Sequence, residues 1–240
     1  MPDPLFADIR LASIYDDIEG ARRDLDQYEA IVAELDARSV VDVGCGTGVL
    51  ACRLARRGLE VFGIDPAQAS LHVAASKPQA ELVTWLLGDA VDLPPLSVDV
   101  ATMTGNVAQV FVTDSAWQLT LDRVHAALVD DGHFVFEARD PAARGWEHWR
   151  DQPASTIDTA AGLVDYSVEL TKVDLPLLSF RQTYRFRATG DLLTSDSTLR
   201  FRERSEIEQS LEIAGFDVVT VRDAPDRPGL EFVFIARRTR

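Results

Sequence analysis

The stretch Val41-Asp42-Val43-Gly44-Cys45-Gly46-Thr47-Gly48 joins a β-branched run at residues 39–43 to an amphipathic segment at residues 48–57. The run predicts a buried strand, and the segment predicts a helix. Glycines between the two allow a tight turn in which the backbone approaches a ligand without interference from Cβ atoms. The first N–H groups of the following helix have no partner within the helix and are available to a ligand. The stretch therefore predicts a strand–loop–helix unit with a ligand at its turn.

The alternation of strand and helix continues on both sides of this loop. We predict helices over 25–35, 67–76 and 116–128, strands over 60–64, 82–87, 98–103 and 132–137, and, near the end of the chain, a helix stopped by Gly215 and strands over 217–221 and 231–236. Strands separated by helices of this length form a parallel sheet through right-handed crossovers. The predicted fold class is therefore α/β, a Rossmann-like, doubly wound, seven-stranded sheet that is mostly parallel with the last strand antiparallel.

Residues 164–201 follow a different pattern, because apolar and polar residues alternate with a period of two. This pattern predicts an antiparallel meander of three strands, with one covered face and one polar face. The covered face would carry Tyr166, Tyr184 and Phe186. The polar face would carry five arginines, Arg181, Arg185, Arg187, Arg200 and Arg202. We therefore predict a core formed by residues 1–140 and 203–240, with residues 141–202 inserted as an antiparallel β lid or substrate subdomain.

Composition narrows the classes of partner. The formal net charge of −15 disfavours nucleic acid, whose phosphates require clustered Lys and Arg. No apolar run is long enough to span a bilayer, so no membrane partner is expected. Cys45 and Cys52 provide neither metal-ligand spacing nor a disulfide framework. We therefore expect a cytoplasmic protein without a metal site, whereas the sequence carries no signal for its oligomeric state.

The glycine loop also indicates the kind of ligand. A dinucleotide-binding fingerprint would need a glycine at position 49, where this chain has Val49. Asp42 lies two residues before the first glycine, where an acid suits a ligand ammonium group better than a pyrophosphate. The loop therefore favours a zwitterionic ligand that carries an adenosine.

Two further acids follow the next predicted strands. Asp65 ends the strand over 60–64, and Gly88-Asp89-Ala90 follows the strand over 82–87. The carboxyl ends of parallel strands lie at one edge of the sheet, where ligands of such folds bind. Together with the glycine loop, these positions resemble the class I S-adenosylmethionine-dependent methyltransferases, and the resemblance extends over nearly the whole chain.

The resemblance implies a role for each motif. The glycine loop would wrap the methionine part of S-adenosylmethionine, Asp65 would bind both ribose hydroxyls, and Asp89 would pair with the adenine amine. The segment over 99–106 would face the transferred methyl, and Tyr15 would lie on an N-terminal segment folded over the cofactor. The cofactor-binding residues expected on this basis are Tyr15, Asp42, Gly44, Cys45, Gly46, Gly48, Asp65, Pro66, Asp89, Ala90, Thr104 and Gly105.

The expected reaction is methyl transfer to a small-molecule acceptor by in-line displacement, with S-adenosylhomocysteine as the product. Such a reaction depends on alignment, and it needs a general base only if the acceptor must lose a proton. Candidate acceptor-side residues are Asn106, Arg139 and His148. Arg139 is equally consistent with an ion pair, whereas the helical spacing of Trp146 and Trp149 around His148 favours packing under the meander over a base.

Three rival functions stay open at this point. A methyltransferase acting on RNA or protein would use the same cofactor chemistry but would need a basic groove. A non-catalytic module would bind S-adenosylmethionine without an acceptor cavity beside it. A nicotinamide-dependent oxidoreductase would share the fold but is opposed by Val49.

Overall fold

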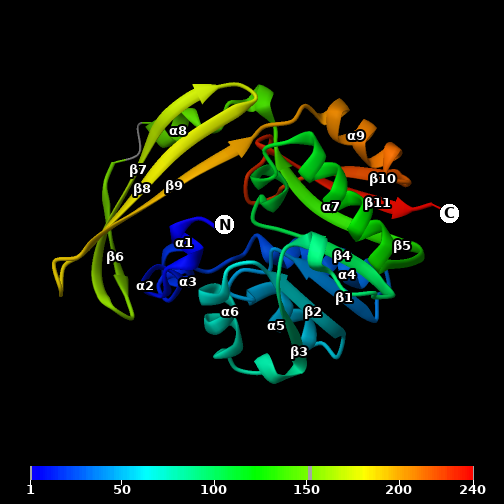
Figure 1. Ribbon diagram of the computed structural model, residues 1–240, viewed down its shortest axis with the longest axis horizontal. Helices are drawn as coiled ribbons and strands as arrows, with labels where there is room; N and C mark the ends of the chain where they lie inside the picture. The colour runs from blue at the N-terminus through cyan, green and yellow to red at the C-terminus, as the bar shows by residue number, and fades with distance from the viewer. Residues whose placement is uncertain (1, 151–152, 240) are drawn as a thin grey trace.

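The computed structural model describes residues 2–150 and 153–239, and these residues form two β-sheets (Figure 1). The larger sheet has seven strands in the order β10–β11–β5–β4–β1–β2–β3. Its strands are β1 (Ser39–Val43), β2 (Glu60–Asp65), β3 (Val83–Leu87), β4 (Val98–Met103), β5 (Leu128–Arg139), β10 (Phe216–Asp223) and β11 (Glu231–Arg238). The smaller sheet has the order β6–β7–β8–β9.

β1 lies in the middle of the larger sheet, as its β-branched composition predicts. It pairs in parallel with β2 on one side and β4 on the other, with Val41 opposite Phe62 and Ala101. β11 runs antiparallel to both β5 and β10. The predicted seven-stranded, mostly parallel sheet with an antiparallel end is confirmed.

Helices cover both faces of the larger sheet. The helices are α1 (Pro4–Ala7), α2 (Ile9–Ala12), α3 (Tyr15–Glu19), α4 (Leu25–Glu34), α5 (Val49–Ala55), α6 (Gln68–Ala75), α7 (Asp114–Ala127), α8 (Glu147–Arg150) and α9 (Arg204–Ile213). Short 3₁₀ turns are η1 (Ala80–Leu82), η2 (Ala90–Asp92), η3 (Val107–Val110) and η4 (Pro141–Ala143). α4 and α5 share one apolar cluster with the sheet, whereas α7 and α9 share another, so the sheet is doubly wound.

The smaller sheet has four strands, not the three predicted. They are β6 (Ser155–Thr159), β7 (Gly162–Asp174), β8 (Leu177–Phe186) and β9 (Leu192–Arg200), all antiparallel. β6 was missed because its sequence, Ser-Thr-Ile-Asp-Thr, has one apolar residue and no alternation to detect. All four strands fall inside the predicted insertion, 141–202, although the division into two folding units stays a prediction.

The N-terminal helices fill the space between the two sheets, where α1, α2 and α3 appear in blue (Figure 1). The Leu5 N–H donates to Ser195 Oγ on β9 at 3.0 Å, and Ser70 Oγ on α6 donates to the Phe6 carbonyl at 3.1 Å. Apolar side chains of these helices also pack against β7 and β8. The N-terminal segment therefore connects the smaller sheet to the core.

The prediction that all five arginines lie on a polar sheet face is wrong for Arg200 and Arg202. Arg202 is only 5% exposed, and its guanidinium donates to the Phe111 carbonyl at 2.7 Å and lies over the Trp117 ring. Arg200 pairs with Asp114 at 2.8 Å. The chain leaves the sheet at this point and passes the connection between η3 and α7, which covers the face that alternation alone would leave open.

We expect the Arg202→Met variant to lower the free energy of unfolding by about 2–4 kcal/mol, because two buried carbonyl acceptors and a partly buried one lose their partner. Urea denaturation measures this loss, and Arg181→Met is the matched control because its ion pair with Asp196 is exposed. Equal stability losses in the two variants would contradict the structural role of Arg202.

In the part of the chain that the structure describes, no helix combines the length and the apolar character needed to cross a membrane.

Candidate active site

The carboxyl edge of the larger sheet opens onto a cavity of about 430 Å³, here called the first cavity. Gly44, Cys45 and Gly46 from the loop after β1 line it, together with Asp65 at the end of β2 and Gly105 after β4. This is the edge at which ligands of doubly wound sheets bind.

The glycine loop is held in a conformation that other residues rarely adopt. Gly44, Gly46 and Gly48 have φ values of +70°, +53° and +75°. A Cβ on Gly46 would meet no protein atom within 4 Å, so this backbone borders open space at the cavity. The loop can therefore approach a ligand closely.

Asp65 ties the end of β2 to the glycine loop. Its Oδ2 accepts the Gly46 N–H at 2.8 Å, and its Oδ1 accepts the Ala67 N–H at 2.8 Å. Burial raises the pKa of this carboxyl, while the two backbone hydrogen bonds oppose the shift. Each oxygen accepts one backbone bond and keeps lone-pair capacity for ligand hydroxyls.

Asp42 lies deeper in the same wall and is only 2% exposed. Thr102 Oγ1 donates to its Oδ1 at 2.8 Å. Burial raises the pKa of Asp42 to about 7, and neither this hydrogen bond nor Arg22 offsets the loss of hydration. Without a ligand, this carboxyl therefore titrates near neutral pH, and a bound cation would favour its ionised form.

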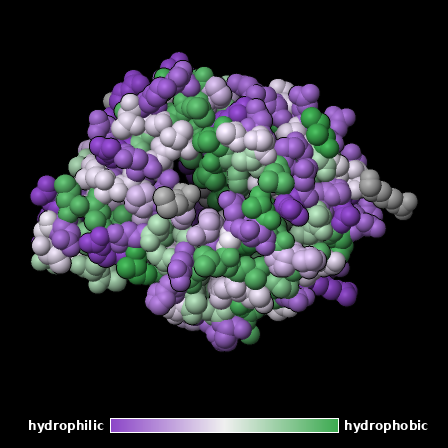
Figure 2. Space-filling view, viewed as in Figure 1, coloured by the Kyte–Doolittle hydropathy of each residue, from purple (hydrophilic) through white to green (hydrophobic). Residues whose placement is uncertain are grey.

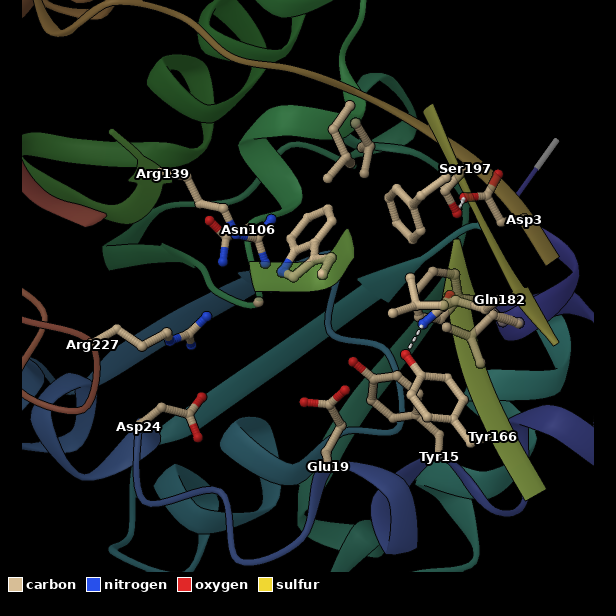
Figure 3. Close-up of a pocket in the computed structure, with 18 of the residues that line it drawn as sticks. Asp3, Tyr15, Glu19, Asp24, Asn106, Arg139, Tyr166, Gln182, Ser197 and Arg227 are labelled. Atoms are coloured by element: carbon tan, nitrogen blue, oxygen red, sulfur yellow. Dashed lines mark hydrogen bonds between the residues drawn. The ribbon is translucent and has the colours of Figure 1, made fainter. Parts of the chain in front are cut away.

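A second cavity of about 460 Å³ lies beneath the smaller sheet (Figure 3). Its lining combines aromatic rings, acids and arginines, among them Tyr166, Phe180 and Trp149. The two cavities share a wall formed by Asp3, Phe6, Tyr15, Arg22, Gly105 and Val110. On the face in Figure 2, polar and apolar residues are interspersed, and a hollow opens between the part that carries the smaller sheet and the rest. A molecule in the second cavity would therefore lie next to one in the first.

A buried polar network supports the floor of the second cavity. The Asn106 N–H donates to Glu137 Oε1 at 2.8 Å, and Asn106 Nδ2 donates to Glu231 Oε1 at 3.1 Å. The Tyr28 hydroxyl donates to the other Glu137 oxygen. Burial and the nearby Glu231 raise the pKa of Glu137. The network fixes the loop after β4 to β5 and β11.

Comparison with known proteins agrees with this architecture. Residues 40–132 match the family model described as a methyltransferase domain. The chain therefore carries a methyltransferase domain over these residues. A relative from Geobacillus sp. (strain WCH70) is 33% identical over 104 residues, which are 42% of each chain. The matched part of this chain spans less than half the length of the first curated relatives.

Solved methyltransferase structures share the fold over nearly the whole chain. A sugar N-methyltransferase from Streptoalloteichus sp. superposes with a TM-score of 0.78 at 16% identity and covers 94% of this chain and 91% of its own. An amino pentose methyltransferase from Micromonospora echinaspora, solved with S-adenosylmethionine bound, gives 0.71 at 19% identity and 94% coverage of both chains. At these identities the likeness shows the fold alone.

Most residues predicted to bind the cofactor line the first cavity. They are Tyr15, Asp42, Gly44, Cys45, Gly46, Asp65, Pro66, Asp89, Thr104 and Gly105. Gly48 is buried and faces Trp85, and Ala90 is buried behind Asp89, to which its N–H donates at 2.6 Å. Contact of these residues with the cofactor stays a prediction.

The candidate acceptor-side residues differ in position. Asn106 and Arg139 line the second cavity, but the Asn106 amide is engaged by Glu137 and Glu231. His148 is exposed, and its neighbour Trp149 lines the cavity in its place. This position does not favour His148 as a base for the acceptor.

Several lining residues were missed by the sequence analysis. Phe111 and Thr113, which line the first cavity, lie between η3 and α7 and belong to no motif, and Glu19 was not singled out at all. Glu19 stands four residues after Tyr15, one helical turn away, so the two share a face of α3. This spacing was the signal that could have identified Glu19.

Proposed function

We propose that this protein transfers a methyl group from S-adenosylmethionine in the first cavity to a small polar molecule in the second. The shared wall between the two cavities carries this proposal, because methyl transfer requires donor and acceptor to be in contact. A module that only bound the cofactor would not need the second cavity.

The residues of the first cavity fit S-adenosylmethionine. The Gly46 backbone borders open space, the carboxylates of Asp42, Asp65 and Asp89 line the cavity, and the basic residue of this lining, Arg22, is paired with Asp24. Such a lining suits the ammonium, sulfonium and ribose groups of this ligand. The same acids would repel the pyrophosphate of a nicotinamide dinucleotide, which favours methyl transfer over the oxidoreductase alternative.

When bound, S-adenosylmethionine supplies an electrophilic methyl group on a positively charged sulfur. The protein contributes alignment, because Asp65 and the glycine loop hold one ligand and the second cavity holds the other. Residues of the smaller sheet and of the N-terminal helices line the second cavity, so they would position the acceptor. No covalent intermediate with a protein nucleophile is required.

The acceptor that we propose is a small molecule. A cavity of about 460 Å³ is in the range that encloses drug-sized ligands. The solved sugar and amino pentose methyltransferases with the same fold support this size class. An RNA acceptor would need free cations at the opening, which the net charge of −15 disfavours.

Calorimetric titration with S-adenosylmethionine, with NAD⁺ in parallel, tests the proposal. We expect S-adenosylmethionine to bind and NAD⁺ not to bind. Binding of NAD⁺ alone would overturn the assignment.

The Asp65→Ala variant is expected to bind S-adenosylmethionine about 1–3 kcal/mol more weakly, because charge-assisted hydrogen bonds to the ligand are lost. Calorimetry measures this change. Asp122→Ala, an exposed acid on α7, is the matched control and should bind like the parent. Asp65→Asn removes the charge and keeps one carbonyl oxygen, which can accept only one of the two backbone hydrogen bonds. Unchanged affinity in Asp65→Ala would contradict the predicted role.

A further inference from the structure

The arginines that line the second cavity are each engaged by an acid of the protein. Arg22 Nη2 lies 2.9 Å from Asp24 Oδ2, and Arg227 Nη1 lies 2.8 Å from Glu231 Oε1. Arg139 Nε lies 3.5 Å from Glu231 Oε1, and its guanidinium stacks over an aromatic ring. These cations are therefore largely neutralised before any ligand enters.

Glu19 is the opposite case. Its carboxylate lines the second cavity, yet among the described residues it accepts no side-chain or backbone hydrogen bond and forms no ion pair within 4.0 Å. In Figure 3 the carboxylate points into the cavity beside the hydroxyl groups of Tyr15 and Tyr166. A carboxylate that lines a cavity, is accessible and has no partner within the protein is available to pair with a cationic group of a ligand.

We propose that Glu19 binds the protonated amine of the acceptor and takes one proton from it. This inference rests on the proposed function, since it names the acceptor class for the same second cavity. The acceptor is thus a small primary or secondary amine, and Glu19 is the residue that selects it over an alcohol or an acid.

The surroundings of Glu19 suit an organic ammonium. Rings of Tyr15, Tyr166, Phe180 and Trp149 line the same cavity, and aromatic faces attract cations and pack against apolar carbon. Enclosure by the protein raises the pKa of Glu19, although the side chain is accessible through the cavity. The charged groups that act on it are Arg22, Arg139 and Arg227, which lower its pKa, and Asp24, which raises it.

The proton step is balanced within the site. One N–H bond of the ammonium breaks, and its electron pair stays on nitrogen as a lone pair. The proton forms an O–H bond with a Glu19 carboxylate oxygen, so a cation and an anion become a neutral amine and a neutral acid. The free lone pair is what an amine needs to accept a methyl group, and the raised pKa of Glu19 makes this exchange less unfavourable than it would be with a carboxylate of ordinary pKa.

The test uses ligand-observed NMR titration of the full chain saturated with S-adenosylhomocysteine. Three ligands of the same ring size are compared: cyclohexylammonium, cyclohexanol and cyclohexanecarboxylate. We expect the ammonium to bind about tenfold more tightly than either of the others. Glu19→Gln should remove this preference, whereas Glu212→Gln, the same change at an exposed site on α9, should keep it.

A pH series separates recognition by charge from a purely structural role. In the parent, ammonium binding should weaken as the pH falls through the raised pKa of Glu19, because the protonated acid no longer attracts the cation. In Glu19→Gln this dependence should be absent. Absence of ammonium binding, preference for the carboxylate, or equal binding in parent and Glu19→Gln would each overturn the proposal.

A separate binding measurement distinguishes failure of the proposed methyl transfer from failure of the role proposed for Glu19. Calorimetry of the parent with S-adenosylhomocysteine precedes the amine titrations, and lack of binding there would overturn methyl transfer itself. Normal binding of this nucleoside without ammonium selectivity would overturn only the role of Glu19.

Discussion

The Asp42→Asn variant is expected to be more stable than the parent at pH 8 and to lose most of its affinity for S-adenosylmethionine. Burial raises the pKa of Asp42 to about 7 in the protein without ligand, whereas its ordinary value is 3.8. A carboxyl whose pKa is raised in the folded state contributes its full stability only at pH values below its ordinary pKa. That contribution is lost as the pH rises through about 7.

Asp42→Asn should therefore stabilise the protein only at pH values where the parent carboxyl is ionised. Above about pH 7 the parent must hold an ionised, buried carboxylate, whereas the asparagine side chain of the variant is neutral at every pH and still accepts the hydrogen bond from Thr102. We expect a gain of about 2–4 kcal/mol in the free energy of unfolding at pH 8, and almost none at pH 4. Urea denaturation at the two pH values measures the change.

Affinity should move in the opposite direction. The proposed ligand brings an ammonium to the first cavity, and an ionised Asp42 is worth about 100-fold in binding to such a group. Affinity of the parent should rise with pH through about 7, whereas that of Asp42→Asn should stay low and flat. A variant that is no more stable than the parent at pH 8, or that binds as tightly, would contradict this account.

The core of the fold could be predicted because its signals are local. Strand and helix patterns alternate along the first 140 residues, and the glycine loop joins the first of these strands to its helix. Each crossover between parallel strands is constrained to one hand. The acids at or just after the carboxyl ends of β1, β2 and β3 then meet at one edge as a consequence of the parallel arrangement. This geometry is why most of the predicted residues line the first cavity.

The second cavity could not be predicted in the same way, because its walls come from distant parts of the chain. Asp3 accepts a hydrogen bond from Ser197 at 2.5 Å, although the two are separated by most of the sequence. The burial of Arg202 depends on carbonyl groups near Phe111, a contact that has no periodic signal. Glu19 likewise gains its importance from tertiary packing of α3 beneath the smaller sheet.

Alanine variants of three glycines with positive φ, Gly46, Gly48 and Gly58, distinguish backbone strain from loss of ligand space and from overpacking. Gly58 is exposed and a Cβ there would meet nothing within 4 Å, so Gly58→Ala should cost about 1–2 kcal/mol of stability through backbone strain alone. Gly46→Ala should cost a similar amount. Because its Cβ would enter open space at the first cavity, it should also weaken S-adenosylmethionine binding about tenfold or more.

Gly48→Ala is expected to have the largest effect on folding. Its Cβ would lie 2.4 Å from Trp85 Cη2 and 2.9 Å from Ala74 Cβ, so overpacking adds to the strain and the loss should reach about 2–5 kcal/mol. Thermal and urea denaturation of the three alanine variants measure the ranking. Replacing Trp85 by Leu should recover part of the loss in Gly48→Ala and none in Gly58→Ala, because only the first pair is in contact. If Gly48→Ala were as stable as Gly58→Ala or more stable, the contact with Trp85 would not explain why position 48 requires glycine.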